Sequence, residues 1–172
     1  MPKQHSQNGF SLVEVLVAVL IISIGLVGLA GMQLVGLKGS QQSFSKNQAA
    51  HHTQALLERM RGNPAGVFAD AYAKDSSMLN CATPPATDCT AVSVSCTDVE
   101  IATYDFYKAY CGGPGVSSGG IRGDLSNSRL VISCPVDCVT GVTISVTWQE
   151  QVLGQESSDN SVPRQLSLNT RI

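Results

Sequence analysis

An apolar run near the N-terminus constrains this chain more than any other feature of its sequence. The run covers residues 10–37, and Glu14 is the one charged residue within it. At about 1.5 Å per residue, a helix of this length exceeds the roughly 30 Å hydrocarbon core of a bilayer. The run therefore predicts a membrane-spanning helix.

A cleaved secretory signal is the alternative explanation for such a run. A signal of that kind has an apolar region of about 7–15 residues, followed by a small-residue cleavage site. Here the run is longer, and the small residue, Gly9, precedes it. The sequence therefore argues against secretory cleavage.

The carboxylate of Glu14 needs an explanation, because an acidic residue at the bilayer centre costs about 2.5–3.5 kcal/mol. One explanation is that Glu14 lies near the start of the run and snorkels to the interface. The other begins with a cut between Gly9 and Phe10, which creates an α-amino group four residues before Glu14. The ammonium and the carboxylate then neutralise each other, within one chain or between neighbouring chains. Pairing between chains sets the stagger of stacked subunits.

These residues carry a specific resemblance. The string GFSLVE, residues 9–14, resembles the G-F-[ST]-L-x-E processing motif of type IV prepilins and type II secretion pseudopilins. The resemblance implies that residues 1–9 are a leader and that the prepilin peptidase cuts after Gly9. It also implies N-methylation of Phe10 and a role in assembly for Glu14.

The segment after the apolar run extends the resemblance. Residues 56–64 read LLERMRGNP, similar to the PilV-type minor pilins (pilus modification proteins), in which a polar helix ends in L-x-E-R-M-R and then N-P. This implies a low-abundance subunit that primes assembly or modifies the pilus tip. The implied partners are other minor pilins, the major pilin, a tip adhesin and inner-membrane lipid.

The first helix is expected to have two halves, transmembrane over residues 10–37 and amphipathic over residues 38–61. If it is continuous, its 52 residues span roughly 78 Å. Gly62 and Pro64 supply a stop. A stripe at helical spacing in the second half is suited to packing on a domain, and it consists of Ala49, His52, Leu56, Leu57 and Met60.

Residues 62–172 are expected to form an α+β head domain. A capping-box pattern at Thr97–Glu100 predicts a helix to about Tyr110. Three segments alternate with period two, which predicts a small antiparallel sheet covered on one face by the first helix, a type IV pilin-like arrangement. The inward positions are Leu130, Ile132 and Cys134, then Val142, Ile144, Val146 and Trp148, then Leu166, Leu168 and Ile172. The glycine-rich residues 112–123 lack the ending of a phosphate-binding loop and are expected to form a connection.

The cysteines all lie beyond the apolar run, at Cys81, Cys89, Cys96, Cys111, Cys134 and Cys138. An even number on one side of a membrane segment favours disulfides in an oxidising compartment. A zinc site is the competing interpretation, but Cys-x-x-Cys spacing is absent. Six cysteines permit 15 connectivities, and we prefer the sequential one, 81–89, 96–111 and 134–138. Each bridge contributes roughly 2–4 kcal/mol, and a redox-active 134–138 pair is the rival role.

Catalysis finds little support in this composition. No histidine follows His52, so the head alone cannot form a Ser–His–Asp or Cys–His arrangement. His51 and His52 point about 100° apart on a helix, which rules out a shared metal face. We expect no enzyme activity, no cofactor and no metal.

The expected location is the inner membrane, as a single-pass protein with a periplasmic head, and then the pilus or cell surface after assembly. Three alternatives stay open: a type II secretion pseudopilin, a membrane-anchored periplasmic enzyme, and a DNA-uptake pilin with Lys108, Arg122 and Arg129 clustered. From residue 62 onward, 6 basic residues face 11 acidic ones. This acidic balance argues against nucleic acid as a partner. The sequence leaves the choice between adhesion, twitching motility and DNA uptake undecided.

Overall fold

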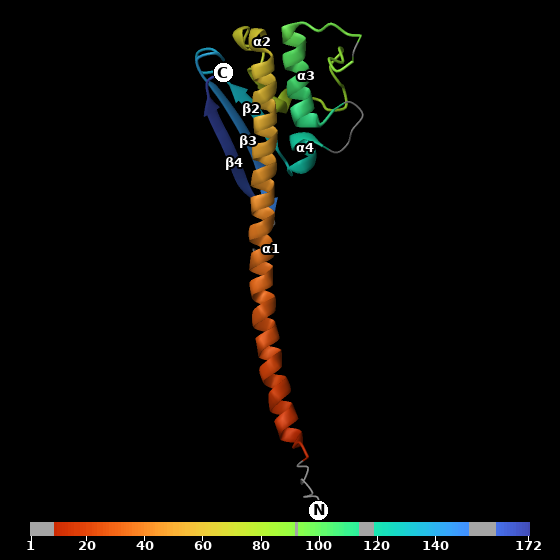
Figure 1. Cartoon of the computed structure of the whole chain (residues 1–172), viewed down its shortest axis with the longest axis vertical. Coiled ribbons are helices and arrows are strands. Elements are labelled where there is room, and N and C mark those ends of the chain that lie inside the picture. Colours follow the sequence, from red (N-terminus) through yellow and green to blue (C-terminus); the bar gives the residue numbers. More distant parts are fainter. Residues whose placement is uncertain (1–8, 92, 114–118, 152–160) are drawn as a thin grey trace, which may run out of the picture. The chain divides into compact units, whose positions relative to one another are not determined.

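The computed structural model describes residues 9–91, 93–113, 119–151 and 161–172. It is an α+β fold with a long N-terminal helix and a four-stranded antiparallel sheet, as predicted (Figure 1). The elements are α1 (Leu12–Gly62), α2 (Pro64–Phe68), β1 (Lys74–Asp75), the 3₁₀ turn η1 (Ser76–Met78), α3 (Asp98–Cys111), α4 (Gly120–Asp124), β2 (Arg129–Ser133), β3 (Val142–Gln151) and β4 (Ser161–Thr170). The chain divides into two compact units, Met1–Gln41 and Gln42–Ile172.

The end of α1 is set by Asn63. Helix α1 runs to Gly62, one residue beyond the expected end. Asn63 then caps α2, because its Oδ1 accepts a hydrogen bond from the Gly66 backbone N–H at 3.1 Å. Pro64 occupies the first position of α2, where its missing N–H costs nothing. The Asn-Pro pair therefore ends one helix and begins the next.

The sheet has the strand order β1-β2-β3-β4, and every neighbouring pair is antiparallel. The inward side chains predicted for β2 and β3 are buried, with Leu130 opposite Val146. In β4, Leu166 and Leu168 are only partly buried. Cys134 and Ile172 lie just beyond the strand ends. Period-two alternation thus located the three long strands, while two-residue β1 carries no such signal.

The core of the second unit joins the sheet to the last turns of α1. Ala49, Leu56 and Met60 are fully buried in the same cluster as Ile144 and Trp148. The expected stripe needs one correction, at His52. Thr53 is buried next to it instead, and its hydroxyl donates to the Ala49 carbonyl at 2.8 Å, so the polar group is satisfied within the helix.

His52 lies at the border of this stripe. It is half-buried, and its Nε2 lies 2.7 Å from Asp124 Oδ2 in α4. His51, its neighbour, is exposed. His52 therefore links α1 to α4 rather than filling the core.

Helix α3 starts where the sequence predicts. The Thr97 hydroxyl accepts a hydrogen bond from the Glu100 N–H, and the Glu100 carboxylate accepts one from the Thr97 N–H. This reciprocal pair is the predicted capping box. The helix ends at Cys111, followed by Gly112 at φ 87°.

The glycine-rich segment departs from the expected connection. Residues 114–118 lie outside the described residues, but Gly120–Asp124 form helix α4. Buried Ile121 and Leu125 anchor it. Gly120 is at φ 69°, and a Cβ there would lie 2.7 Å from the Tyr110 carbonyl oxygen. Glycine is needed at this position because α4 packs against the backbone at the end of α3.

A buried polar network joins the end of α1 to α3. Arg59 Nη1 donates to Asp105 Oδ1 at 3.0 Å, and the Tyr72 hydroxyl donates to Asp105 Oδ2 at 2.9 Å. Asn63 Nδ2 donates to the Asp98 carbonyl at 2.8 Å and lies 3.3 Å from the Tyr72 hydroxyl. Burial raises the pKa of Tyr72 well above its usual range. The raised pKa favours the protonated hydroxyl, which is the form that donates to Asp105.

Replacing Asp105 with alanine should lower the free energy of unfolding by about 1–3 kcal/mol, since it leaves Tyr72 and Arg59 without their acceptor. Unfolding of the detergent-solubilised chain can be followed by the fluorescence of buried Trp148, the sole tryptophan. Glu58→Ala is the matched control. It removes an exposed ion pair between Glu58 and Arg61, both in α1, and should cost no more than about 0.5 kcal/mol. Equal losses in the two variants would contradict the network's role.

Candidate functional site

The first feature of the candidate site is the peptide bond between Gly9 and Phe10. Both residues precede α1, and the first helical hydrogen bonds run from Glu14 and Val15 to the Ser11 carbonyl, at 3.0 and 3.3 Å. Among the described residues, a Cβ added to Gly9 would meet nothing within 4 Å beyond its chain neighbours, and Phe10 is 84 % exposed. A protease needs an accessible, non-helical peptide, and this bond meets both conditions.

The second feature is the apolar surface of α1. Every large apolar side chain from Leu12 to Leu37 is exposed, between 48 % (Val17) and 89 % (Leu12). Within the described part of the chain, α1 is the helix long and apolar enough to cross a membrane. The Ser23 hydroxyl is satisfied within the helix, since it donates to the Val19 carbonyl at 2.7 Å. A surface of this size requires lipid or other apolar helices around it.

The third feature is Glu14, in the first turn of α1. Its carboxylate lies near the positive end of the helix dipole, where a negative charge is favoured. The ion pairs among residues 9–91, 93–113, 119–151 and 161–172 do not involve Glu14. The side chain is exposed and so is available to a positive group outside this chain or at a new N-terminus.

The head carries three disulfides: Cys81–Cys111, Cys89–Cys96 and Cys134–Cys138. The last is the pair preferred from the sequence, but the sequential pairing is wrong for the other four cysteines. The reason is α3, since Cys96 precedes the helix and Cys111 is its final residue. Fourteen helical residues separate their Cα atoms by about 20 Å, well beyond the reach of a disulfide.

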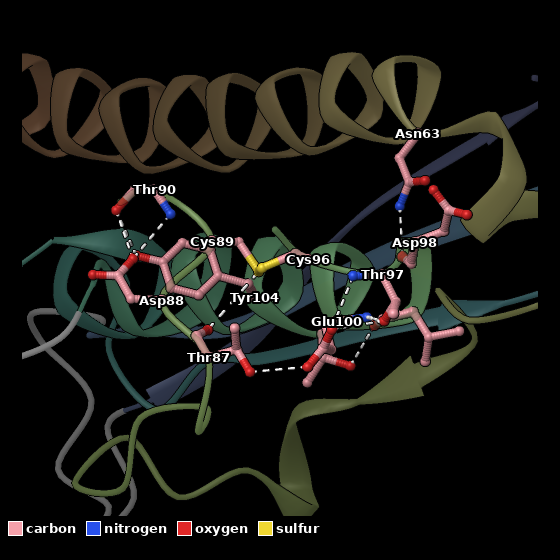
Figure 2. The surroundings of a disulfide bond; sticks show 12 residues. Asn63, Thr87, Asp88, Cys89, Thr90, Cys96, Thr97, Asp98, Glu100 and Tyr104 are labelled. Atoms are coloured by element: carbon pink, nitrogen blue, oxygen red, sulfur yellow. Dashed lines mark hydrogen bonds between the residues drawn. A yellow bond between two sulfur atoms is a disulfide. The ribbon is translucent and has the colours of Figure 1, made fainter. Parts of the chain in front are cut away.

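The long bridge brings distant segments together. Cys81 and Cys111 have Cα atoms 5.5 Å apart, and the Tyr107 hydroxyl donates to the Cys81 carbonyl at 2.8 Å. Figure 2 shows the short Cys89–Cys96 bridge directly before the capping box, with Thr87 donating to Glu100 at 2.9 Å. The loop before α3 is thus tied to both ends of that helix.

The Cys134–Cys138 bridge closes the turn between β2 and β3. Asp70 lies beside it, and the three ligand-type atoms are within 4.8 Å of one another. Both sulfurs are in the disulfide, so neither is available as a thiolate. Asp70 instead accepts a hydrogen bond from the Cys138 N–H at 2.8 Å. The disulfide and this hydrogen bond therefore stabilise the turn between β2 and β3.

Two family models match the chain. The prokaryotic N-terminal methylation motif matches residues 4–30, and type IV pilin Tt1218 matches residues 31–107. No curated protein and no solved structure matches. The chain is a type IV pilin-like prepilin. The first match contains Gly9, Phe10 and Glu14, and the second contains the end of α1 together with most of α3.

The segment LLERMRGNP of this pilin has a structural role at six of its nine positions. Leu56, Leu57 and Met60 are buried, and Arg59 pairs with Asp105. Asn63 and Pro64 make the corner into α2. Sequence reasoning noticed the motif but missed its partners Tyr72 and Asp105, which are 9 and 46 residues away from Asn63 and Arg59. No local pattern marks such partners.

The three basic residues considered for DNA uptake, Lys108, Arg122 and Arg129, lie in different elements of the fold. Arg129 pairs with Asp75 across β1 and β2, through Nε to Oδ1 at 3.0 Å and a second bond from Nη2 to Oδ2. Lys108 lies in the last turn of α3, and Arg122 lies in α4. The bidentate pair commits the charge of Arg129 to Asp75 and therefore weakens the idea of a basic DNA-binding cluster.

The same pair links stability to pH. The Arg129 guanidinium, together with the Ser77 N–H, holds the pKa of Asp75 well below its usual range. A carboxyl group whose pKa is lower in the folded state stabilises the fold above its unfolded pKa of about 3.9. That contribution is lost as the pH falls towards the folded-state pKa.

Asp75→Asn should therefore lose stability at neutral pH, by less than about 1 kcal/mol because the pair is partly exposed. It should also lose less further stability than the parent between pH 5 and pH 3. The measurement is denaturant unfolding across that range, read by Trp148 fluorescence. Arg129→Gln should flatten the profile in the same way, and a parent-like profile in either variant would argue against the pair.

Proposed function

We propose that this chain is a minor pilin of the type IV pilus. Its precursor sits in the inner membrane as a single-pass protein, with residues 10–37 of α1 in lipid and the head, residues 62–172, in the periplasm. The prepilin peptidase cuts after Gly9, and Phe10 is N-methylated. The observation that carries this proposal is the exposed, non-helical Gly9–Phe10 bond placed directly before a bare apolar helix.

Glu14 guides assembly in this proposal. Cleavage creates an α-ammonium at Phe10, one helical turn from the Glu14 carboxylate. In an apolar bundle both charges are costly alone and stabilise each other as a pair. A pair formed between neighbouring chains also fixes their stagger, because helices at any other register leave both charges unpaired.

The role is structural rather than enzymatic, which the likeness to pilins supports. The mature helix joins a bundle of like helices, and the disulfide-bonded head lies on the outside. As a low-abundance subunit, the protein primes assembly or modifies the tip, together with other minor pilins, the major pilin and a tip adhesin. The PilV-type string at residues 56–64 is what supports this subtype.

The mature protein should begin at Phe10, carry one extra methyl group, and weigh six hydrogens less than its reduced form. Processing explains the first two features and three disulfides explain the third. Intact mass and N-terminal fragmentation of the protein recovered from the producing cell measure all three. A chain that still begins at Met1, in cells with active prepilin peptidase, would overturn the proposal.

Glu14→Ala should reduce recovery in sheared pili by about tenfold or more, since loss of a pairing worth about 1.4 kcal/mol changes an equilibrium tenfold. The variant should still accumulate in the membrane. Val13→Ala is the matched control in the same turn and should be recovered normally. Normal recovery of Glu14→Ala would refute the assembly role, whereas a parent chain found only with secretion-system components would favour the pseudopilin alternative.

A further inference from the structure

A groove of about 690 Å³ lies in the second unit and is lined by residues of β1, η1, α3 and β2. Its most buried lining residues are Phe106 and Ile132, each 2 % exposed. Leu79 and Met78 also line the groove, and Met78 is 92 % exposed. The volume falls within the roughly 300–1,000 Å³ of small-molecule sites, and the apolar lining suits the apolar part of a ligand.

Lys74 is the cation that lines this groove. It is opposite Ile132 in the register of β1 and β2, and opposite residues of an antiparallel pair point to the same face of the sheet. Because Ile132 is on the buried face, Lys74 points towards that face as well, and it is half-buried. The ion pairs between described residues do not include Lys74. A half-buried ammonium of this kind favours a negative charge supplied from outside the chain.

The other polar side chains at the groove differ in whether they are already bound. Asp75 follows Lys74 in β1 and so points to the opposite face, where its carboxylate is held in the bidentate pair described above. The Thr103 hydroxyl donates to the Val99 carbonyl at 2.9 Å. The Ser133 hydroxyl, in contrast, has no hydrogen-bond partner among the described residues. The open groups are therefore an ammonium and a hydroxyl, and both donate hydrogen bonds to anions.

We propose that this groove binds a small amphiphilic carboxylate, a molecule with an apolar body and one negative charge. The apolar body lies against Leu79, Phe106 and Ile132. The carboxylate binds the Lys74 ammonium, with the Ser133 hydroxyl as a second donor. The site lies within the head, and the proposal does not depend on the proposed function.

The charge of the site favours a carboxylate over a phosphate. A single ammonium balances a single carboxylate, whereas a phosphate monoester carries about −1.5 to −2 at pH 7. Binding a phosphate would leave part of its charge unmatched in a groove whose other lining is mostly apolar.

A lysine that points inward on an edge strand also has a second use, since it shields the edge from the addition of another strand. Strand β1 is such an edge, with two residues. The two roles differ in one measurable respect: a ligand site distinguishes an apolar anion from a neutral molecule of the same shape, and a shield does not.

The test uses the full chain in detergent and the photo-reactive probe p-benzoylbenzoate, which joins an apolar benzophenone to one carboxylate. After irradiation, the adducts are located by proteolysis and mass spectrometry. We expect an adduct within residues 73–79, above all at the exposed side chain of Met78. Adducts within residues 10–37 measure non-specific partition of the probe and serve as the internal reference. The neutral analogue p-benzoylbenzamide should label residues 73–79 about fivefold less, because it lacks the charge that pairs with Lys74.

Lys74→Gln should lower labelling of the groove by p-benzoylbenzoate about fivefold, because it removes the counter-charge. Lys74→Arg keeps the charge and should keep the adduct. Lys108→Gln is the matched control, since it makes the same change at a half-buried lysine outside the groove, and it should label like the parent. The comparison of the two probes uses the parent chain, so it decides the question even where Lys74→Gln folds poorly.

Three results would overturn the ligand site: no labelling of residues 73–79 above the reference, equal labelling by the two probes, or undiminished labelling in folded Lys74→Gln. Equal labelling by the two probes would leave Lys74 as a shield of the short β1 edge.

Discussion

The rest of this structure depends on apolar surface that the chain does not cover itself. From Leu12 to Leu37 the large side chains of α1 project outward without a protein partner among the described residues. Water is a poor environment for so long an apolar helix, and a bilayer or a bundle of similar helices is a good one. A helix with these two acceptable environments can pass from one to the other at small cost. That property suits the passage from membrane to filament that we propose for this chain.

In the second unit, the arrangement of the helices depends on the hydrogen bonds of Asn63. One side chain caps α2, contacts Tyr72 and binds the backbone of Asp98, so it contacts three segments at once. Arg59 adds a charged hydrogen bond to Asp105 from the preceding turn. Because these groups are buried and mutually satisfied, alternative arrangements of α1 and α3 would leave unpaired polar atoms. The network therefore specifies one orientation between the helices in addition to stabilising it.

Local patterns in the sequence predicted the local parts of the structure. The capping box gave the start of α3, alternation gave β2 and β3, and helical spacing gave Leu56 and Met60 as core residues. The failures concern partners that are far apart in the sequence. The disulfide Cys81–Cys111 and the pair Arg129–Asp75 join residues 30 and 54 positions apart, and such choices depend on the packed fold. Helix α4 was missed because its first residue, Gly120, serves close packing against the end of α3, a requirement that composition alone does not reveal.

The Cys81–Cys111 bridge has a mechanical consequence. In the filament proposed above, a head that is pulled and begins to unravel would lengthen by about 3.5 Å for every residue released. The bridge encloses 30 residue steps, so it withholds roughly 100 Å of that extension. The segment also contains the second disulfide and the whole of α3. Under load, the half of the head containing α3 thus behaves as a fixed-length link, whereas β3 and β4 can still peel apart.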